Sequence, residues 1–183
     1  MAIKKWTITN EEALLHTPIF SLFQHDAQSP EDENKKGKFF HFKLPGWVNV
    51  IAITKDQKVV MVEQYRHGNH EISLEIPGGI IDPGEDPLVA GVRELREEAG
   101  GVGSDAEIIG VVDANPAMQD NSCWTILVRD VELAEQSLDE LEEIAVHLID
   151  IDTIPDMIRS RKLRHSLVVA AFQHYHLWLT KPE

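Results

Sequence analysis

The sequence has one cysteine, few basic residues and no long hydrophobic run. The lone Cys123 excludes an intramolecular disulfide and a cysteine-rich zinc site within these 183 residues. Lys and Arg total 17 against 31 Asp and Glu, a formal net charge of −14, which disfavours nucleic acid and an anionic membrane surface as partners. No run is long enough to cross a membrane, and the first residues lack the apolar core of a signal peptide. We therefore expect a cytoplasmic protein.

The chain is long enough for one sizeable domain with its own core, since 43% of its residues are hydrophobic. Two β-rich runs near the N-terminus, Ile19–His25 and Lys38–Leu44, are separated by a polar loop. Residues 1–45 are therefore expected to form an N-terminal β extension. Residues 46–183 are expected to form a single globular unit.

The pattern within residues 46–183 favours the α/β class. Trp47–Thr54 and Val59–Tyr65 are β-rich runs joined by four polar residues, which predicts a hairpin. Three further strand-like runs follow a central helix, at 107–112, 123–130 and 144–149. Two helical segments close the chain, at 153–160 and 164–179. Strands before and after a central helix, with helices at the end, suggest a mixed β-sheet covered on both faces.

The central helix follows a Gly/Pro-rich loop within the stretch Leu74–Gly101. Asp86 is a favoured N-cap, Pro87 suits the first helical position, and Gly100 or Gly101 predicts the end. The predicted buried face consists of apolar residues at helical spacing: Leu88, Val89, Val92, Leu95 and Ala99. Glutamates at i, i+3 and i+4 crowd one stripe: Glu94, Glu97 and Glu98. This crowding costs roughly 0.2–0.5 kcal/mol per pair unless a cation offsets it, so the helix suggests a metal site.

Taken alone, the helix also fits a solvated charged face in which Arg93 and Arg96 pair with glutamates. The residues before it change the balance, because the stretch follows the pattern G-x5-E-x7-R-E-U-x-E-E-x-G-U, where U is apolar. Its fixed positions are Gly79, Glu85, Arg93, Glu94, Glu97, Glu98 and Gly100. Chance would produce such a match about once in a million. The chain therefore resembles the Nudix hydrolases, with one departure: Gly101 occupies the closing apolar position and Val102 follows it.

The resemblance implies a Nudix α/β/α sandwich with a mixed β-sheet, and it covers most of the chain from about Trp47 onward. In members that hydrolyse ADP-ribose and related nucleotide sugars, an N-terminal β region commonly helps to build a homodimer and the substrate pocket. The first forty residues resemble such an extension. They equally fit an edge hairpin that contributes stability alone.

The resemblance also assigns roles to residues of this sequence pattern, which is called the Nudix box. Direct metal ligands are expected to be Glu94 and Glu98, with Glu97 as a third ligand or a ligand through water, and with the backbone carbonyl of Gly78. The expected cofactor is Mg²⁺, with Mn²⁺ as an alternative, because Mg²⁺ suits an all-oxygen site of carboxylates, a carbonyl, water and phosphate. Structural roles are expected for Gly79, Glu85 and Arg93, with Glu85 bracing Arg93.

Residues outside the box are candidates for the substrate and for the catalytic base. Arg66 ends a strand and is a candidate diphosphate contact, although a surface arginine fits nearly as well. Glu75 is a second candidate substrate contact, or it simply flanks the loop. The acidic run 138–146 resembles the loop that supplies the base in the ADP-ribose group, so Glu140 is the expected base and Glu142 its substitute. A charged surface loop is the alternative interpretation of this run.

The function that these features predict is Mg²⁺-dependent hydrolysis of the pyrophosphate bond of nucleoside diphosphate sugars, giving a nucleoside monophosphate and a sugar phosphate. Pro116 lies shortly beyond the box, as a proline does in ADP-ribose hydrolases. The expected partners are therefore a small nucleotide sugar and a second copy of the chain, and neither nucleic acid nor a membrane. Two alternatives remain: a non-catalytic Nudix domain that senses such a ligand, and a nucleoside triphosphate hydrolase.

Overall fold

The computed structural model describes residues 2–181 of the chain. These residues divide into two compact units, which we describe separately. The first unit runs to Pro45 and also includes Asp113–Asn121, and the second consists of Gly46–Val112 and the described residues from Ser122 onward. The sequence did not indicate that Asp113–Asn121 belongs with the N-terminal strands, because nothing in the composition of this segment distinguishes it from its neighbours.

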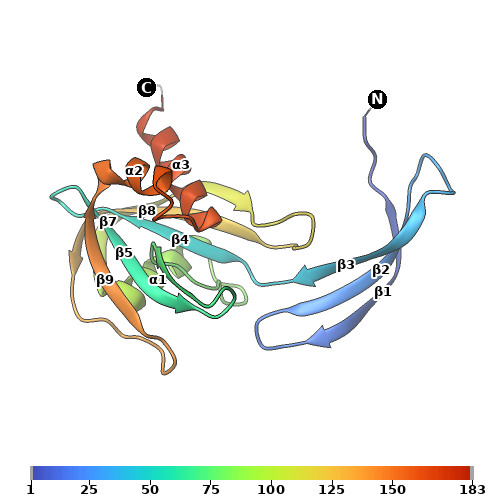
Figure 1. Cartoon of the computed structure of the whole chain (residues 1–183), viewed down its shortest axis with the longest axis horizontal. Helices are drawn as coiled ribbons and strands as arrows, with labels where there is room; N and C mark the ends of the chain where they lie inside the picture. The colour runs from blue at the N-terminus through green and yellow to red at the C-terminus, as the bar shows by residue number, and fades with distance from the viewer. Residues whose placement is uncertain (1, 182–183) are drawn as a thin grey trace. The chain divides into compact units, whose positions relative to one another are not determined.

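The first unit is built on a three-stranded antiparallel sheet, seen in blue in Figure 1. Its strands are β1 (Thr7–His16), β2 (Ser21–Gln28) and β3 (Lys36–Lys43), in that order across the sheet. The predicted runs 19–25 and 38–44 correspond to β2 and β3, whereas β1 was not predicted. All ten residues of β1 are exposed, so no buried face requires apolar and polar residues to alternate along it. Without a sustained alternation, the sequence did not indicate this strand.

The second unit contains two further three-stranded sheets, which together make up its mixed β structure. One sheet has the order β4-β8-β7, in which β4 and β8 run parallel, and the other has the antiparallel order β6-β5-β9. The strand bounds are Trp47–Ala52 (β4), Lys58–Arg66 (β5), Glu71–Glu75 (β6), Gly101–Asp113 (β7), Ser122–Leu133 (β8) and Ile144–Asp150 (β9).

The hairpin predicted from Trp47–Thr54 and Val59–Tyr65 is confirmed at its turn, where Ile53 and Val59 form an antiparallel bridge, but the pairing does not extend along β4 and β5. β4 and β5 belong to different sheets, and they are joined by a tight turn in which the Thr54 amide donates to the Lys58 carbonyl at 2.9 Å. The cause is that both strands are apolar on two faces, so each is covered by helices and pairs with other partners. The sequence pattern identified the strands but not their neighbours.

Helices cover both faces of the central strands. β4 alternates its side chains: Val48, Val50 and Ala52 pack in the cluster that contains Leu95 and Ala99 of α1 (Pro87–Ala99). Between them, Ile51 packs toward Val168, Ala171 and Phe172 of α3 (Ser166–Leu179). Figure 1 shows α3 and the short α2 (Ile154–Arg159) on one side of β4 and α1 on the other. No helix in the described part of the chain has both the length and the apolar character needed to cross a membrane.

The caps of α1 agree with the sequence prediction, but its buried face does not. The Asp86 side chain accepts the Leu88 amide, and Gly100 ends the helix in the left-handed conformation at φ 64°. Val89 and Val92 are exposed, at 58% and 43%, although both were expected to be buried. The buried stripe is instead Ala90, Gly91, Leu95, Glu98 and Ala99. Gly91 decides this orientation, because a Cβ there would press into Ile126 of β8.

Candidate active site

Two glycines place the loop before α1 close to both β4 and the helix. The Gly79 amide and carbonyl bond to the carbonyl and amide of Val48, at 3.1 and 2.9 Å. A Cβ on Gly78 would collide with the Val48 carbonyl oxygen, and a Cβ on Gly79 would collide with the carboxylate of Glu94. Glycine at both positions therefore allows the loop backbone to lie against the acidic stripe of the helix.

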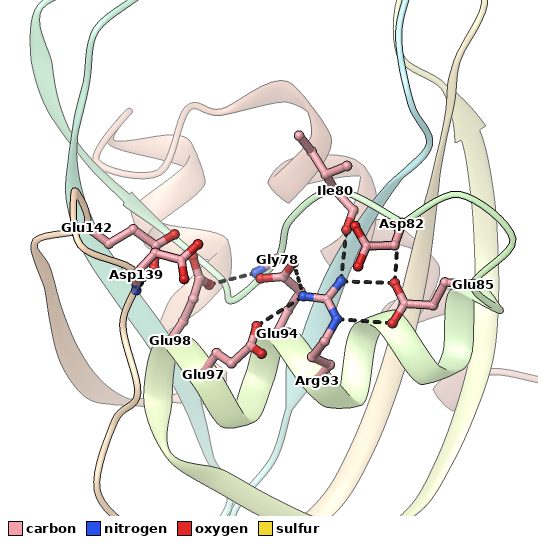
Figure 2. A network of polar contacts seen from close by, with 10 residues as sticks. All are labelled: Gly78, Ile80, Asp82, Glu85, Arg93, Glu94, Glu97, Glu98, Asp139 and Glu142. Carbon is pink, nitrogen blue, oxygen red and sulfur yellow. Dashed lines mark hydrogen bonds and ion pairs between the residues drawn. The ribbon is translucent and has the colours of Figure 1, made fainter. Parts of the chain in front are cut away.

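Arg93 is the centre of the polar network that joins the loop to the helix (Figure 2). Its guanidinium donates twice to Glu85, at 3.0 and 3.0 Å, and once to the Ile80 carbonyl at 3.0 Å. The same group donates to Glu94 at 2.8 Å and to Glu97 at 3.0 Å. Hydrogen bonds from Arg93 hold the pKa of Glu85 below its usual range. Arg93 therefore holds the loop against the helix. It also orients one carboxylate oxygen of Glu94 and one of Glu97, because both accept from the same guanidinium nitrogen.

Glu98 is the most buried carboxylate of the stripe. Its side chain accepts the Gly78 amide at 2.8 Å, and 3% of the residue is exposed. Burial raises the pKa of Glu98 to about 8, and the nearby charges of Glu94 and Glu142 add to the effect. Burial also raises the pKa of Glu94, although Arg93 opposes this rise. The protein thus holds carboxylates where their charged forms are poorly solvated.

These carboxylates line a cavity of about 220 Å³ in the second unit. The cavity walls come from β4, β5, the loop before α1, α1 itself and the segment before β9: Trp47, Gln64, Arg66, Gly78, Gly79, Ile80, Arg93, Glu94, Glu97, Glu98, Ser137, Asp139 and Glu142. Five of these side chains are carboxylates and two are guanidinium groups, so the lining carries three more formal negative than positive charges. A strongly anionic substrate would be repelled from such a cavity without a bound cation.

The residues present fit a divalent cation. Glu94, Glu97 and Glu98 offer carboxylate oxygens on one face of α1, and Mg²⁺ and Mn²⁺ prefer oxygen ligands. The raised pKa values of Glu94 and Glu98 show that the nearby arginines do not fully compensate the buried acids. A bound cation would stabilise the charged forms of these two groups and lower their pKa values. The carbonyl of Gly78 remains a predicted fourth ligand.

Comparison with known proteins agrees with this geometry. The model of the NUDIX domain matches residues 44–167 of the chain. The chain belongs to the NUDIX domain family. A methanol dehydrogenase activator of Bacillus methanolicus is 30% identical over 168 residues, which cover 91% of this chain and 90% of that protein. An ADP-ribose pyrophosphatase of Bacillus subtilis is 26% identical over 178 residues, which cover 96% of this chain and 95% of that protein.

A solved structure confirms the Nudix fold as well. The crystal structure of an ADP compounds hydrolase superposes with a TM-score of 0.86 at 21% sequence identity, covering 98% of this chain and 96% of that chain. The mixed α/β fold with helices on both faces, predicted from the sequence, is therefore confirmed. Among the Nudix box residues, Glu94, Glu97 and Glu98 meet at one cavity, while Glu85 and Arg93 brace the loop around it.

The structure brings together Arg66 and Glu75, which the sequence nominated separately. Arg66 donates two hydrogen bonds to Glu75, at 2.8 and 2.7 Å, across the antiparallel pair β5–β6. Burial by itself raises the pKa of Glu75, but the hydrogen bonds and charge of Arg66 outweigh it and hold the pKa below its usual range. Arg66 lines the Nudix cavity, whereas both oxygens of Glu75 are occupied by Arg66. Glu75 thus orients Arg66.

The segment before β9 contributes Glu142 to the cavity. Of the two candidate bases, Glu142 lies among the described residues that line the Nudix cavity, and Glu140 does not. Figure 2 shows Glu142 and Asp139 beside Glu98, and the Asp139 amide donates to the Glu142 side chain at 3.0 Å. The negative charge of Glu142 also contributes to the raised pKa of Glu98.

Several residues of the cavity were not nominated from the sequence. Gln64, Ser137 and Asp139 line it, and none of them belongs to the Nudix box. Gln64 precedes Arg66 by two positions on β5, so the period of two along a strand was an available signal once Arg66 was chosen. Ser137 and Asp139 lie on a segment without regular structure, where no periodicity predicts which side chains point inward.

Proposed function

We propose that the chain hydrolyses the pyrophosphate bond of nucleoside diphosphate sugars, with ADP-ribose as the first candidate, to a nucleoside monophosphate and a sugar phosphate. The observation that carries the proposal is the cavity of about 220 Å³ in which Glu94, Glu97 and Glu98 meet Arg66 and the glycine loop. The names of two relatives, an ADP-ribose pyrophosphatase and an ADP-sugar pyrophosphatase of Mus musculus, support this substrate class.

Mg²⁺ is the proposed cofactor, with Mn²⁺ as the alternative, held by Glu94, Glu97, Glu98 and the carbonyl of Gly78. When bound, the cation neutralises diphosphate oxygens and acidifies the attacking water. Arg66 would contact the diphosphate, because its guanidinium is held toward the cavity by Glu75. Trp47 also lines the cavity and offers a flat apolar surface to the nucleotide.

Glu142 is the proposed general base, in place of Glu140. Water supplies the oxygen of the new P–O bond, one of its protons moves to Glu142, and the P–O bond to the bridging oxygen breaks. The leaving phosphate takes the bridging oxygen with its electron pair, so atoms and charge balance. Glu142 lies on a segment without regular structure, which allows its carboxylate to adjust to the water when substrate is present.

The proposal extends to the assembly and location of the enzyme. We propose a cytoplasmic homodimer in which residues 1–45 form the dimer element and residues 46–183 the hydrolase domain. The exposed apolar residues on β1 and β3, among them Ile8, Leu15, Phe39 and Phe40, support an association of this kind. Light scattering coupled to size-exclusion chromatography should give twice the chain mass of 20.7 kDa, and a monomer at micromolar concentration would contradict the dimer.

Product analysis tests the proposed reaction. Purified protein is incubated with ADP-ribose, GDP-mannose, ADP-glucose and a nucleoside triphosphate, each with Mg²⁺, with Mn²⁺ and with chelator. We expect metal-dependent release of nucleoside monophosphate from at least one of the three nucleotide sugars. Rapid release of product from the triphosphate alone would instead favour the triphosphate hydrolase. Folded protein that forms no product with any of them would overturn the catalytic proposal.

A second candidate function is the regulation of a partner enzyme, because the relative that covers 91% of this chain at 30% identity is named a methanol dehydrogenase activator. The test adds the wild-type chain and Glu98→Gln to a methanol dehydrogenase and measures its rate. Stimulation by both proteins would establish regulation through binding. Stimulation by the wild type alone would link regulation to the hydrolytic site, and stimulation by neither would exclude this function for the dehydrogenase tested.

A further inference from the structure

A second group of metal-binding side chains lies in the first unit, on the three-stranded sheet. Glu11 on β1, His25 on β2 and His41 on β3 each offer a ligand atom, and these atoms all lie within 4.8 Å of one another. We call this group the strand cluster. None of its members belongs to the Nudix box, and the inference drawn from it does not depend on the proposed hydrolysis.

Strand register brings the two histidines to one face of the sheet. His25 pairs with Phe39 and Phe23 pairs with His41, so the two imidazoles occupy neighbouring, diagonally related positions. Their ring centroids are 5.2 Å apart. Both ring positions are limited by aromatic stacking, since Phe39 stacks on His25 at 6.0 Å and Phe23 on His41 at 5.5 Å. The sheet thus places two imidazoles next to each other before any ligand binds.

A β-bulge brings Glu11 to the same place. The register between β1 and β2 shifts between Thr9 and Glu12, so Asn10 and Glu11 together oppose His25. Asn10 has a positive φ of 51°, and its side chain donates to Asp26 at 3.1 Å. Bulges redirect side chains from the regular alternation of a strand. Here the bulge places the Glu11 carboxylate 3.9 Å from the Nε2 atom of His41.

The imidazoles have nitrogen atoms that nothing else in the described chain satisfies. The Nδ1 atoms of His25 and His41 are both buried and have no hydrogen-bond partner among the described residues. Buried polar atoms in folded proteins are nearly always hydrogen-bonded, or they bind a ligand. Each of these two neighbouring histidines therefore keeps one ring nitrogen without a partner among the described residues, and the Nε2 atom of His41 lies 3.9 Å from Glu11.

We propose that Glu11, His25 and His41 bind Zn²⁺. Two imidazoles and one carboxylate form a ligand set that zinc accepts, with a fourth position left for water or another ligand. Mg²⁺ is disfavoured, because it prefers oxygen ligands and near-ideal octahedral geometry. Tetrahedral zinc with bonds of about 2.0 Å places its ligand atoms roughly 3.3 Å apart, so rotations of the exposed Glu11 side chain and the histidines would close the site.

The fourth position of this site would face a cavity of about 680 Å³ within the first unit. All three members of the strand cluster line this cavity, and its other walls are mostly apolar, including Trp6, Phe39 and Met118. Pro116 and Ala117 also line the cavity, so the segment 113–121 contributes part of its wall. Zinc would therefore join the three strands to one another and present one open coordination position to an apolar pocket.

Zinc binding to the full chain tests the proposal. The wild type, His25→Ala/His41→Ala and His147→Ala are equilibrated with Zn²⁺ in saturating Mg²⁺, desalted, and analysed for bound zinc. His147 is the matched control, because it also has one nearby glutamate, Glu63 at 3.5 Å, but is exposed on β9. We expect the double variant to retain one equivalent of zinc less than the wild type, and His147→Ala to match the wild type. Equal zinc in all three proteins would overturn the site.

Two further measurements cover a double variant that does not fold. Glu11→Gln alters an exposed residue and should weaken zinc binding by at least about tenfold in a calorimetric titration. In the wild type, Co²⁺ in place of zinc should give the intense visible absorption of four-coordinate cobalt with imidazole ligands. Unchanged affinity in Glu11→Gln, or a wild-type cobalt spectrum typical of six oxygen ligands alone, would overturn the assignment.

Discussion

The strand cluster and the carboxylates of the Nudix box, Glu94, Glu97 and Glu98, are both suited to metal ions, but the chain builds them differently. The box carboxylates lie on a single helix and offer oxygen alone, with Arg93 donating to Glu94 and Glu97 and the Gly78 amide donating to Glu98. The strand cluster collects one residue from each of three strands, mixes nitrogen with oxygen and relies on aromatic stacking for its orientation. One site suits a hard ion that meets phosphate, and the other suits zinc.

The two sites differ in how far their ligands could be predicted from the sequence. Ligands on one helix are related by the helical repeat, so their spacing alone reveals a common face. Ligands on three strands are related by register, and at Glu11 the register depends on a bulge that no local pattern announces. The sequence therefore predicted the box carboxylates, while it gave no indication that Glu11, His25 and His41 meet.

The largest expected effect comes from Glu98→Gln, which should separate the two sites completely. We expect hydrolysis to fall by about 10³-fold, because a catalytic metal supplies several kcal/mol and each 1.4 kcal/mol is a factor of ten. Zinc bound at the strand cluster should not change. Steady-state rates at saturating Mg²⁺, with Glu132→Gln on the surface as control, check the first part. A rate within threefold of the wild type would contradict the ligand assignment of Glu98.

The next largest effect concerns the segment before β9, which has no counterpart in the strand cluster. Glu142→Gln should lower kcat by about 10²-fold, the lower end for loss of a general base, while KM stays within a factor of about three. Glu140→Gln is the matched control two residues away and should stay near the wild-type kcat. The opposite result, with Glu140→Gln impaired and Glu142→Gln normal, would restore the original assignment from the sequence.

Particular residues show how far the sequence could be used. Asp86, Pro87 and Gly100 encode the ends of α1 locally, and the structure has them as predicted. Val89 and Val92 were assigned to the core because apolar periodicity cannot show that a close approach at Gly91 turns the helix. Strand partners were the other failure, since β4 and β5 follow each other in the chain yet join different sheets. What depends on distant packing or register was beyond local reasoning.

A smaller effect is expected from Arg93→Lys, which retains the charge but loses the planar set of donors. Lysine cannot keep two bonds to Glu85 together with bonds to Ile80, Glu94 and Glu97. We expect about a tenfold loss of kcat/KM and weaker activation by Mg²⁺, as is usual when a residue that supports metal ligands is changed. Titration of activity with Mg²⁺ measures both quantities, with Arg96→Lys on the same helix as control. Identical Mg²⁺ activation in both variants would remove Arg93 from the metal site.

The smallest effect is on stability, and it measures how much the burial of the Glu98 carboxylate destabilises the folded chain. The pKa of Glu98 is about 8 in the folded, metal-free chain, against 4.5 for an ordinary glutamate. Because the unfolded chain loses this proton first, Glu98 destabilises the fold increasingly from about pH 4.5 to about pH 8 and by a constant amount above. Below about pH 4.5 both states are protonated and the contribution disappears.

Glu98→Gln should remove this contribution while its side-chain oxygen still accepts the Gly78 amide. In chelator we expect the Tm of the variant to exceed that of the wild type by on the order of 10 °C at pH 8, since the pKa difference of Glu98 is worth roughly 4 kcal/mol there and 1 kcal/mol shifts Tm by about 2–4 °C. The gap should close near pH 4.5, and Mg²⁺ should narrow it at pH 8 by stabilising the wild type alone. Thermal unfolding followed by circular dichroism measures all three values. A variant less stable than the wild type at pH 8 in chelator would show that the charged Glu98 stabilises the fold, which would contradict the destabilisation expected from its raised pKa.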